Sequence, residues 1–424
     1  MSRPAPTDTI QALASGALPA GIAVVRVSGP AARSAGEALT GERPDAGLQG
    51  LRSLCAADGT VIDRGLVLFF RGPHSFTGED VLELQVHGSR AVVEALADRL
   101  STLGIRTAEP GEFSRRAFEN GRMDLTEVEG LADLIAAQTE AQRRLALAQH
   151  GGALRALYED WAARLLRARA LIEAEIDFAD EDDVPGDASA GIDDDLERVA
   201  SEMASHLERS RFGEIVRDGF RIALLGPPNA GKSSLLNAMV ERDAAIVTDV
   251  PGTTRDLVEV EIERKGLRVV VTDTAGLRET SDRVEAEGIR RARLVAERAD
   301  LRIWLSPEGT APPPELDAVL LRSKADEGGP GVSVRRTDGL AALWSLVDDR
   351  LAGFGPVDVA PTRRRHREGV GDALAALREG LCASEGELKA EHLRRAAHAL
   401  ARITGRVDVE DLLGVIFSEF CVGK

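Results

Sequence analysis

Residues 226–234, GPPNAGKSS, fit the phosphate-binding pattern G-x-x-x-x-G-K-[ST]. Gly226 and Gly231 let the backbone wrap around phosphate, and the N–H groups of the loop and of the following helix bind its negative charge. Lys232 would reach the β- and γ-phosphates, and the Ser233 hydroxyl would bind Mg²⁺. A glycine-rich turn without a ligand is disfavoured, because a strand-like segment precedes the loop and a helical segment follows it. We therefore predict a nucleotide site here.

Two later motifs come in the order that a GTPase requires. PGTTRD offers Thr254 as a second magnesium ligand, and DTAG places Asp273 near the metal and Gly276 near the γ-phosphate. We expect DTAG to end a strand that lies beside the strand before the phosphate loop. The residue after Gly276 is Leu277, where well-understood GTPases have a Gln that orients the attacking water. A leucine side chain has no donor or acceptor, so another residue must hold that water.

Guanine recognition would fall to a variant of the usual N-K-x-D pattern. Ser323-Lys324-Ala325-Asp326 follows the strand-like AVLL, and Asp326 supplies the carboxylate that accepts hydrogen bonds from guanine. Ser323 keeps a hydroxyl but lacks the usual amide, which predicts weaker binding of the base. SVRR (333–336) is a weak signal for a final base-contacting loop.

The surrounding pattern predicts three structural domains. Residues 1–118 read as a small two-layer α+β domain, with strands at 20–29, 64–70 and 80–86 and a helix at 89–104. Residues 217–355 alternate strands, at 220–226, 267–274 and 301–305, with helices, which predicts an α/β domain built on a parallel sheet.

The remaining segments, 119–216 and 356–424, read as helical. From Leu154 to Ile176 the apolar positions are spaced three or four residues apart, which predicts a helix with one buried stripe. Helical character before and after 217–355 predicts one discontinuous helical domain into which the GTPase domain is inserted.

Bulk composition excludes some classes of protein. No stretch of the 424 residues approaches the roughly 18 apolar residues of a membrane helix, and the N-terminus lacks an export signal. Cys55, Cys382 and Cys421 are too few for a disulfide framework or a zinc site, which favours a reducing, cytoplasmic location without a membrane partner.

The net charge of −17 is concentrated in one segment. Residues 173–197 hold twelve acidic residues and no Lys or Arg, so the rest of the chain carries only −5. A solvated acidic loop explains this segment better than a metal site does. The charge does not exclude RNA, and the basic run RRRHR (363–367) is a candidate tRNA contact, with a solvated helix start as the alternative.

Five further motifs carry a resemblance to a known family. They are DTI (8–10), FTGEDVLELQVHG (76–88), PGEFSRRAFENGRMDL (110–125), AAIVTDVPGTTRD (244–256) and the terminal FCVGK (420–424). With the GTPase motifs, they make the chain resemble the MnmE (TrmE) family of tRNA-modification GTPases over nearly its whole length.

The resemblance implies a reaction and partners. Family members work with a flavin-dependent protein of the MnmG (GidA) type, in a heterotetramer, to place an aminomethyl-type group such as carboxymethylaminomethyl at C5 of the tRNA wobble uridine. A tetrahydrofolate derivative (5-formyl- or 5,10-methylene-tetrahydrofolate) bound to the N-terminal domain supplies the carbon. That domain also forms a homodimer.

The resemblance also implies how water and charge are handled during GTP hydrolysis. A potassium ion takes the place of an arginine finger, and its matching ligands are Asn229, Thr248, Val250 and Thr253. The residue matching the one that orients water is Glu285, so the predicted catalytic residues are Glu285, Asn229 and Lys232. The predicted GTP-binding set is Asn229, Ala230, Gly231, Lys232, Ser233, Ser234, Thr248, Thr253, Thr254, Asp273, Thr274, Ala275, Gly276, Ser323, Lys324, Asp326, Ser333, Val334 and Arg335.

The implied folate contacts are Arg26, Glu83, Arg122 and Lys424, where Arg122 replaces the lysine of the usual pattern. SGALPAG replaces the family's usual glycine-rich segment before the first strand, which leaves the detailed shape of the pocket open. The terminal motif implies that Cys421 serves tRNA modification, and a small buried side chain is the alternative. His87 reads as structural, because its motif contains no acid–base partner.

Two other readings remain open from the sequence. One is a GTPase switch in ribosome or RNA assembly, although such switches lack the N-terminal domain and the terminal Cys-x-Gly-Lys. The other is an altered paralogue with weakened guanine selectivity, suggested by Ser323 and by SGALPAG. The sequence does not say which tRNAs are modified, how tRNA is held, or whether glycine or ammonium supplies the amine.

Overall fold

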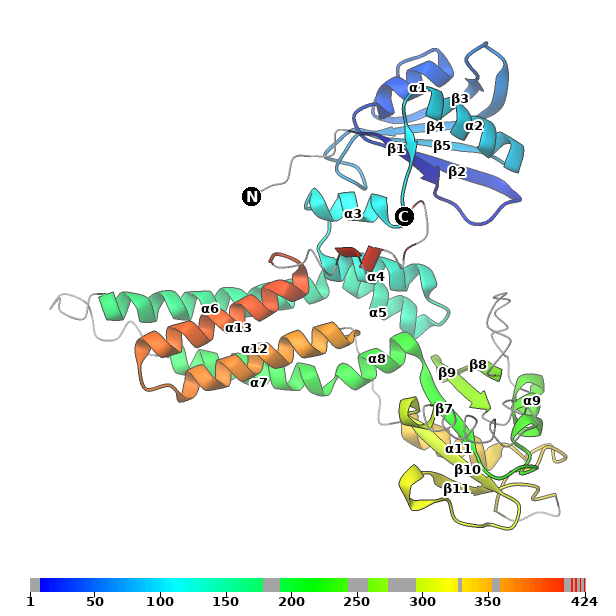
Figure 1. Cartoon of the computed structure of the whole chain (residues 1–424), viewed down its shortest axis with the longest axis vertical. Helices are drawn as coiled ribbons and strands as arrows, with labels where there is room; N and C mark the ends of the chain where they lie inside the picture. Colours follow the sequence, from blue (N-terminus) through cyan, green and yellow to red (C-terminus); the bar gives the residue numbers. More distant parts are fainter. Residues whose placement is uncertain are drawn as a thin grey trace, which may run out of the picture. The chain divides into compact units, whose positions relative to one another are not determined.

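The structure is a computed structural model (Figure 1). It describes residues 8–177, 191–242, 258–273, 295–326, 330–352 and 359–407, together with 413, 414, 416, 417, 420 and 423. The chain divides into two compact units. Unit 1 comprises 1–132, 149–190 and 379–424, and unit 2 comprises 133–148 and 191–378.

Unit 1 contains a six-stranded sheet with the strand order β3-β4-β5-β2-β1-β6. Its strands are β1 (Ile10–Leu13), β2 (Ala20–Ser28), β3 (Gly47–Cys55), β4 (Val61–Phe70), β5 (Val81–Gly88) and β6 (Arg106–Thr107). All neighbouring strands are antiparallel except β1 and β6. The strands predicted at 20–29, 64–70 and 80–86 are confirmed as β2, β4 and β5, whereas β1 and β3 were not predicted.

The two faces of this sheet differ because successive side chains in a strand point to opposite sides. Val25, Val67 and Leu84 belong to the buried core, with Leu96 and Leu100 of helix α2 (Arg90–Thr102). Helix α1 (Ala32–Thr40) lies against β3 and β5. We call the opposite face the outer face, and the strand register determines which residues lie on it. It carries Leu48, Leu51, Leu66, Leu68, Glu83, Gln85, Val24 and Arg26.

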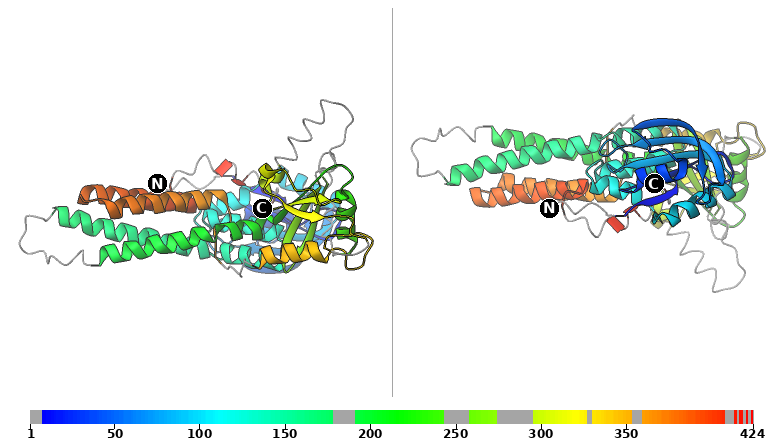
Figure 2. Two further views of the ribbon diagram at one scale, coloured as in Figure 1. Left: turned by 90° about the horizontal axis from the view of Figure 1, so that it is seen from below. Right: turned by 90° about the horizontal axis from the view of Figure 1, so that it is seen from above.

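The helices of unit 1 include α3 (Glu112–Glu119), α6 (Ala153–Asp177) and α13 (Gly386–Thr404). Figures 1 and 2 show α6 and α13 running side by side. The predicted apolar stripe is confirmed at Leu154, Trp161, Leu165, Ala168 and Ile172. Tyr158 is buried where Leu157 was expected, and Ile176 is 37% exposed. Helices α4 (Leu125–Ala136), α5 (Glu140–His150) and α12 (Arg364–Cys382) contribute residues to both units.

Unit 2 contains a five-stranded sheet with the strand order β11-β10-β7-β9-β8. The strands are β7 (Phe220–Leu225), β8 (Val258–Arg264), β9 (Leu267–Asp273), β10 (Leu301–Ser306) and β11 (Val319–Arg322). Neighbours pair in parallel, as predicted, except that β8 pairs antiparallel with β9 at one edge. The predicted strands at 220–226, 267–274 and 301–305 are confirmed as β7, β9 and β10.

Helices cover both the sheet and the flanks of unit 2. They are α7 (Ile192–Glu208), α8 (Ser210–Asp218), α9 (Lys232–Arg242) and α11 (Ala341–Leu351), with a short 3₁₀ turn, η2, at Pro314–Leu316. Val269, Ile303 and Leu343 are fully buried in one core between strands and helices. Within the described ranges, no helix is both long enough and apolar enough to cross a membrane.

Candidate functional site

The phosphate loop lies between β7 and α9. Gly226 has a φ of 141°, and a Cβ added there would come 2.3 Å from the carbonyl oxygen of Leu305 on the neighbouring strand. Asn229 and Gly231 also have positive φ values, 61° and 94°, in the left-handed region that glycine and asparagine tolerate best. The loop therefore needs these residue types to curl its backbone at the start of α9.

Lys232 is held inside the loop and is only 6% exposed. Its ammonium group donates to the carbonyl oxygens of Gly226, at 2.8 Å, and Pro227, at 3.0 Å. The positive charge is thus fixed at the N-terminus of a helix, where anions are favoured. This is the arrangement that binds the phosphates of a nucleotide.

Two oxygen groups meet beside this loop. The Ser233 hydroxyl, in the first turn of α9, donates to Oδ2 of Asp273 across 2.6 Å. Asp273 ends β9, and β9 pairs in parallel with β7 as the sequence predicted, so that Leu224 lies opposite Asp273. Hydroxyl and carboxylate oxygens are hard donors of the kind that Mg²⁺ prefers. Both residues would suit Mg²⁺, and the structure brings the predicted Ser233 and Asp273 together.

The predicted base-reading segment follows β11 at the same carboxyl edge of the sheet. Lys324 has a φ of 56°, and the Ala325 N–H donates to the Val332 carbonyl at 3.0 Å, which closes the loop. Oδ1 of Asp326 accepts from the Ser333 hydroxyl at 2.6 Å, and its Oδ2 lies 3.4 Å from the guanidinium of Arg335. The structure thus joins the weakly predicted 333–336 loop to the base-reading carboxylate.

Ser323 has a shorter side chain than the usual asparagine, and the structure shows how this affects its hydrogen bonding. Its side chain is 4% exposed, and its hydroxyl has no hydrogen-bond partner among the described residues. A buried polar group without a partner costs about 1–3 kcal/mol. The shorter side chain therefore leaves a hydrogen bond unmade in this loop.

Other members of the predicted sets stand as follows. Ala230 is buried, while Asn229, Ser234 and Val334 are exposed beside the site. The predictions for Thr248, Val250, Thr253, Thr254, Thr274, Ala275, Gly276, Glu285, Cys421 and Lys424 fall outside the described residues, and they stay predictions.

A second polar site lies on the outer face of the unit 1 sheet. Arg26 and Glu83 are directly opposite each other on β2 and β5, and Nε of Arg26 donates to Oε1 of Glu83 at 2.9 Å. The Arg26 guanidinium also lies 4.9 Å from the ring centre of Phe76 and 5.8 Å from that of Phe113. These contacts hold a half-buried charge pair against aromatic faces.

Arg122, the third predicted folate contact, packs against Gly78. Gly78 has a φ of 80°, and a Cβ there would lie 3.2 Å from Cγ of Arg122. The Arg122 stem therefore packs on the 71–80 loop that also carries Phe76. Its exposed guanidinium makes no ion pair within the part of the chain that the structure describes.

The C-terminal tail also reaches this face. Phe417 and Phe420 pack with Met123, Leu125 and Val128. Gly423 then comes so close to β1 that an added Cβ would lie 2.0 Å from the carbonyl oxygen of Leu13. Ala12, one residue earlier, lies directly opposite Arg26. Only glycine fits at this close approach to β1, which pairs with the strand that carries Arg26.

Sequence reasoning missed a cluster of charges that joins three of the quoted motifs. Arg116 is 2% exposed, and its guanidinium contacts the carboxylates of Asp8, Glu79 and Glu112. Burial alone would raise the pKa of Glu112, but hydrogen bonds from Arg106, from the Glu109 N–H and from Arg116 lower it overall. Ion pairs therefore join the three motifs DTI, FTGED and PGEFSRRAF. The order of charged residues along the sequence does not reveal these contacts.

His87 has a partner that its own motif does not contain. The half-buried carboxylate of Asp63, on β4, accepts from the His87 backbone N–H at 2.9 Å and lies 2.9 Å from Nδ1 of its ring. The motif itself contains no partner, as the sequence indicated, and the partner comes from the neighbouring strand β4.

The basic run 363–367 is largely neutralised within unit 2. Arg363 contacts Asp133 at 2.9 Å, and Arg367 contacts Glu214 at 2.7 Å. Arg364 pairs with Glu368 one turn along its own helix. This pairing leaves less positive charge for RNA than the sequence suggests.

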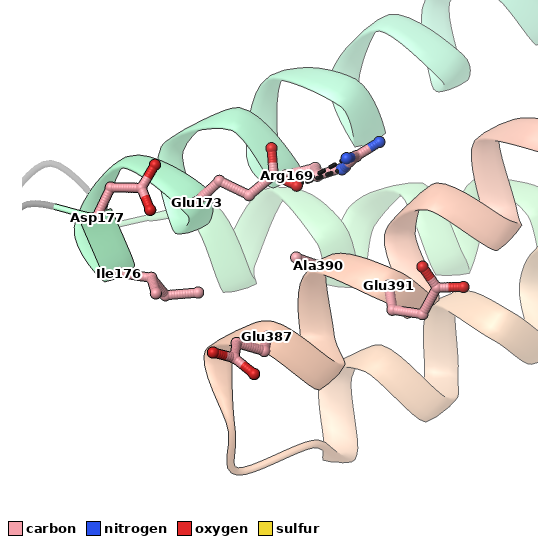
Figure 3. Close-up of a pocket in the computed structure, with 7 residues that line it drawn as sticks. All are labelled: Arg169, Glu173, Ile176, Asp177, Glu387, Ala390 and Glu391. Atoms are coloured by element: carbon pink, nitrogen blue, oxygen red, sulfur yellow. Dashed lines mark hydrogen bonds and ion pairs between the residues drawn. The ribbon is translucent and has the colours of Figure 1, made fainter.

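The acidic segment begins at a hollow between α6 and α13, shown in Figure 3. Glu173, Asp177, Glu387 and Glu391 surround it, and Arg169 contacts Glu173 at 2.7 Å. In the described ranges, this hollow included, no group of three His, Cys, Asp or Glu residues could hold a metal ion.

Three features together are typical of a P-loop GTPase. They are a curled phosphate loop after a strand, a Ser–Asp pair suited to magnesium, and a carboxylate at the same sheet edge that is suited to reading the base. Sequence models of two families match this chain. The MnmE helical domain matches residues 125–421, and the GTP-binding protein TrmE N-terminus matches residues 9–122. The chain belongs to the MnmE family, and it is a GTP hydrolase.

Relatives match along the full length. The tRNA modification GTPase MnmE of Rhizobium meliloti (strain 1021) is 52% identical and covers 99% of both chains. That of Parvibaculum lavamentivorans is 51% identical and covers 98% of this chain and 100% of its own. Among solved structures, the G domain of the T. maritima FeoB iron transporter matches 30% of this chain and 96% of its own length. Its identity is 25% and its TM-score is 0.22.

Proposed function

We propose that this GTPase acts in the cytoplasm on tRNA, in a complex with a flavin-dependent MnmG-type partner that modifies C5 of the wobble uridine. The observation that carries the proposal is the full-length match to relatives named tRNA modification GTPases, which extends through the N-terminal domain and the C-terminal tail. A GTPase that acted only as an assembly switch would have no use for either part.

The nucleotide chemistry assigns separate tasks to this chain's residues. The Lys232 ammonium and the loop N–H groups bind the phosphates, Ser233 and Asp273 hold Mg²⁺, and Asp326 reads guanine. Glu285 holds the attacking water, a task that Leu277 cannot perform. A bound K⁺ would supply positive charge against the charge that develops toward the leaving group.

Asn229 is the described residue of the proposed potassium site. It is exposed in the phosphate loop, and its left-handed backbone turns the loop at this point. An amide oxygen is a suitable ligand for a hard monovalent cation. Thr248, Val250 and Thr253 would complete the site.

The proposed folate site is the part of the outer face around Arg26 and Glu83. A carboxylate and a guanidinium side by side can accept and donate hydrogen bonds to the edge of a pterin ring. Arg122 and Lys424 would add positive charge, and Gly423 lies close to Leu13 of β1. Cys421 would then act in the modification reaction rather than in GTP hydrolysis.

The same face supports a homodimer. Leu48, Leu51 and Leu66 are 64%, 55% and 39% exposed, and they form one apolar row across β3 and β4. Exposed apolar rows of this kind are typical of interaction surfaces. Sedimentation of Leu51→Lys/Leu66→Lys should give a monomer where the unchanged protein gives a dimer.

The function is tested by genetic replacement in the source cell. Without this chain, mass spectrometry of digested tRNA should lose the modified wobble uridine, and the unchanged chain should restore it. Lys232→Ala should fail to restore it, because the phosphates lose their bound cation. If the modification persists without the chain, the proposed function is wrong.

A further inference from the structure

Each of the two carboxylate oxygens of Asp326 has a partner within unit 2. Oδ1 accepts a hydrogen bond from the Ser333 hydroxyl at 2.6 Å, and Oδ2 lies 3.4 Å from the Arg335 guanidinium. Ser333 is buried, whereas the side chain of Asp326 is 33% exposed and that of Arg335 is 80% exposed. Oδ1 is therefore paired with the interior of the loop, and Oδ2 with a cation at its surface.

Backbone contacts fix the positions of these partners. The Ser333 N–H donates to the Gly339 carbonyl at 3.0 Å, and the Ser333 hydroxyl accepts from the Arg335 N–H at 3.2 Å. The Val332 N–H donates to the Arg322 carbonyl at 2.8 Å, which joins the segment to the end of β11. The backbone of Arg335 is thus anchored beside the carboxylate, although its side chain is exposed.

The partner of Oδ2 bears on how strictly the base is read. Guanine offers two donors to a carboxylate, the ring N1–H and the 2-amino group. Hypoxanthine, the base of inosine nucleotides, has the N1–H but lacks the 2-amino group. A site normally rejects such an analogue because the atom that accepted from the missing group is left without a partner. Here Oδ2 keeps its ion pair with Arg335 when the 2-amino group is missing, which lowers that penalty.

The same carboxylate still excludes adenine. The N1 atom of adenine carries no proton and is an acceptor, so it would face the Asp326 oxygens with repulsion instead of a hydrogen bond. Selectivity against adenine therefore does not depend on Arg335.

We propose that Arg335 sets the base selectivity of this GTPase by sharing Oδ2 of Asp326 with the 2-amino group of guanine, so that inosine nucleotides are also accepted. The proposal rests on the proposed function, which assigns base reading to Asp326. Hydrolysis extends to ITP, because ITP and GTP carry the same triphosphate and Lys232 and Ser233 act on that part.

The test measures equilibrium dissociation constants for GDP, IDP and ADP by competition with a fluorescent GDP analogue. These diphosphates are not substrates, and the ratio of the IDP constant to the GDP constant cancels any effect of a variant on phosphate binding. In the unchanged protein, IDP should bind within about tenfold of GDP, and ADP far more weakly than either. Arg335→Met keeps the stem but removes the donors, and it should raise the IDP/GDP ratio about fourfold, the scale of one exposed ionic contact.

Two matched variants separate this contact from general electrostatics. Arg335→Lys keeps the charge and a donor, and it should retain the low ratio. Arg322→Met removes an exposed cation at the end of β11, whose guanidinium donates to the Pro307 carbonyl at 3.3 Å, and it should leave the ratio unchanged. Retained GDP binding shows that each variant is folded.

Four results would overturn the proposal. They are an IDP/GDP ratio above about tenfold in the unchanged protein, a ratio that Arg335→Met does not raise, an equal rise in Arg322→Met, and ADP binding as tight as IDP binding.

Asp326→Asn separates this proposal from base reading itself. It should weaken GDP and IDP alike, because the carboxylate that accepts from N1–H is lost. If GDP binding is unchanged in Asp326→Asn, base reading by Asp326 fails and this inference fails with it. If GDP binding weakens there but Arg335→Met leaves the IDP/GDP ratio unchanged, only the proposal for Arg335 fails.

Discussion

The Ser233 hydroxyl donates a hydrogen bond to the Asp273 carboxylate across 2.6 Å, although forty residues separate them in the sequence. One residue begins helix α9 and the other ends strand β9, and the parallel pairing of β7 and β9 brings them together. Two motifs that the sequence places in order thus lie side by side at one edge of the sheet.

Replacement of Ser323 by asparagine should tighten GTP binding. The Ser323 hydroxyl is buried without a described partner, and an amide restores the longer donor and acceptor that the usual motif provides. One added hydrogen bond is worth about 1 kcal/mol, so the dissociation constant for GTP should fall about fivefold.

Equilibrium binding of a fluorescent GTP analogue, competed with GTP and with ATP, measures this effect. The preference for GTP over ATP should remain, because Asp326 still reads the guanine donors. Equal GTP affinity in the two proteins would mean that the serine is not what weakens this loop.

Arg116→Met should destabilise unit 1 strongly. The side chain is 2% exposed, and its removal leaves the buried Glu79 carboxylate without its cation, while Arg106 still contacts Asp8 and Glu112. Breaking a buried ion pair from one side costs about 3–5 kcal/mol. Arg115→Met, one residue away, breaks only an exposed pair with Glu119 and should cost less than about 1 kcal/mol.

Urea denaturation of both variants measures the difference. Similar midpoints for Arg116→Met and Arg115→Met would show that the buried cluster does not stabilise the fold.

Asp124→Asn should change how stability depends on pH. Burial, with a smaller contribution from the Glu127 charge, raises the pKa of Asp124 to about 6. A carboxyl group whose folded pKa exceeds its unfolded value favours folding when protonated. Its contribution is present below pH 4 and is lost as pH rises through 6, with a total of about 3 kcal/mol.

The asparagine keeps the Oδ1 acceptor that caps helix α4 through the Glu127 N–H and the Thr126 hydroxyl. Between pH 7.5 and pH 5, the unchanged protein should therefore gain stability relative to the variant, as read from paired urea midpoints. A difference between the two proteins that does not vary with pH would contradict the assigned pKa.

The sequence predicts the local elements of this protein better than its long-range polar contacts. Alternation and spacing located β2, β5, β7 and α6, because a half-buried strand or helix must repeat its apolar residues. The edge strand β8 was not predicted, and its antiparallel pairing with β9 depends on a turn rather than on a hydrophobic repeat.

Candidate site residues divide in the same way. The glycine and lysine spacing of the phosphate loop is local, so it could be recognised directly. The partners of His87 and Arg116 come from other strands and from the chain start, and no one-dimensional spacing links Asp63 to His87. The contact of Gly423 with Leu13 joins the two ends of the chain, which only the folded structure reveals.

The central claim is that a cation and Glu285 replace the glutamine that Leu277 cannot supply. It is tested most directly by GTP hydrolysis in KCl and in NaCl at equal ionic strength, for the unchanged protein, Asn229→Ala and Glu285→Ala. We predict faster hydrolysis in KCl, loss of this acceleration in Asn229→Ala, and loss of hydrolysis with retained GTP binding in Glu285→Ala. Equal rates in the two salts, or full activity of Glu285→Ala, would contradict the account.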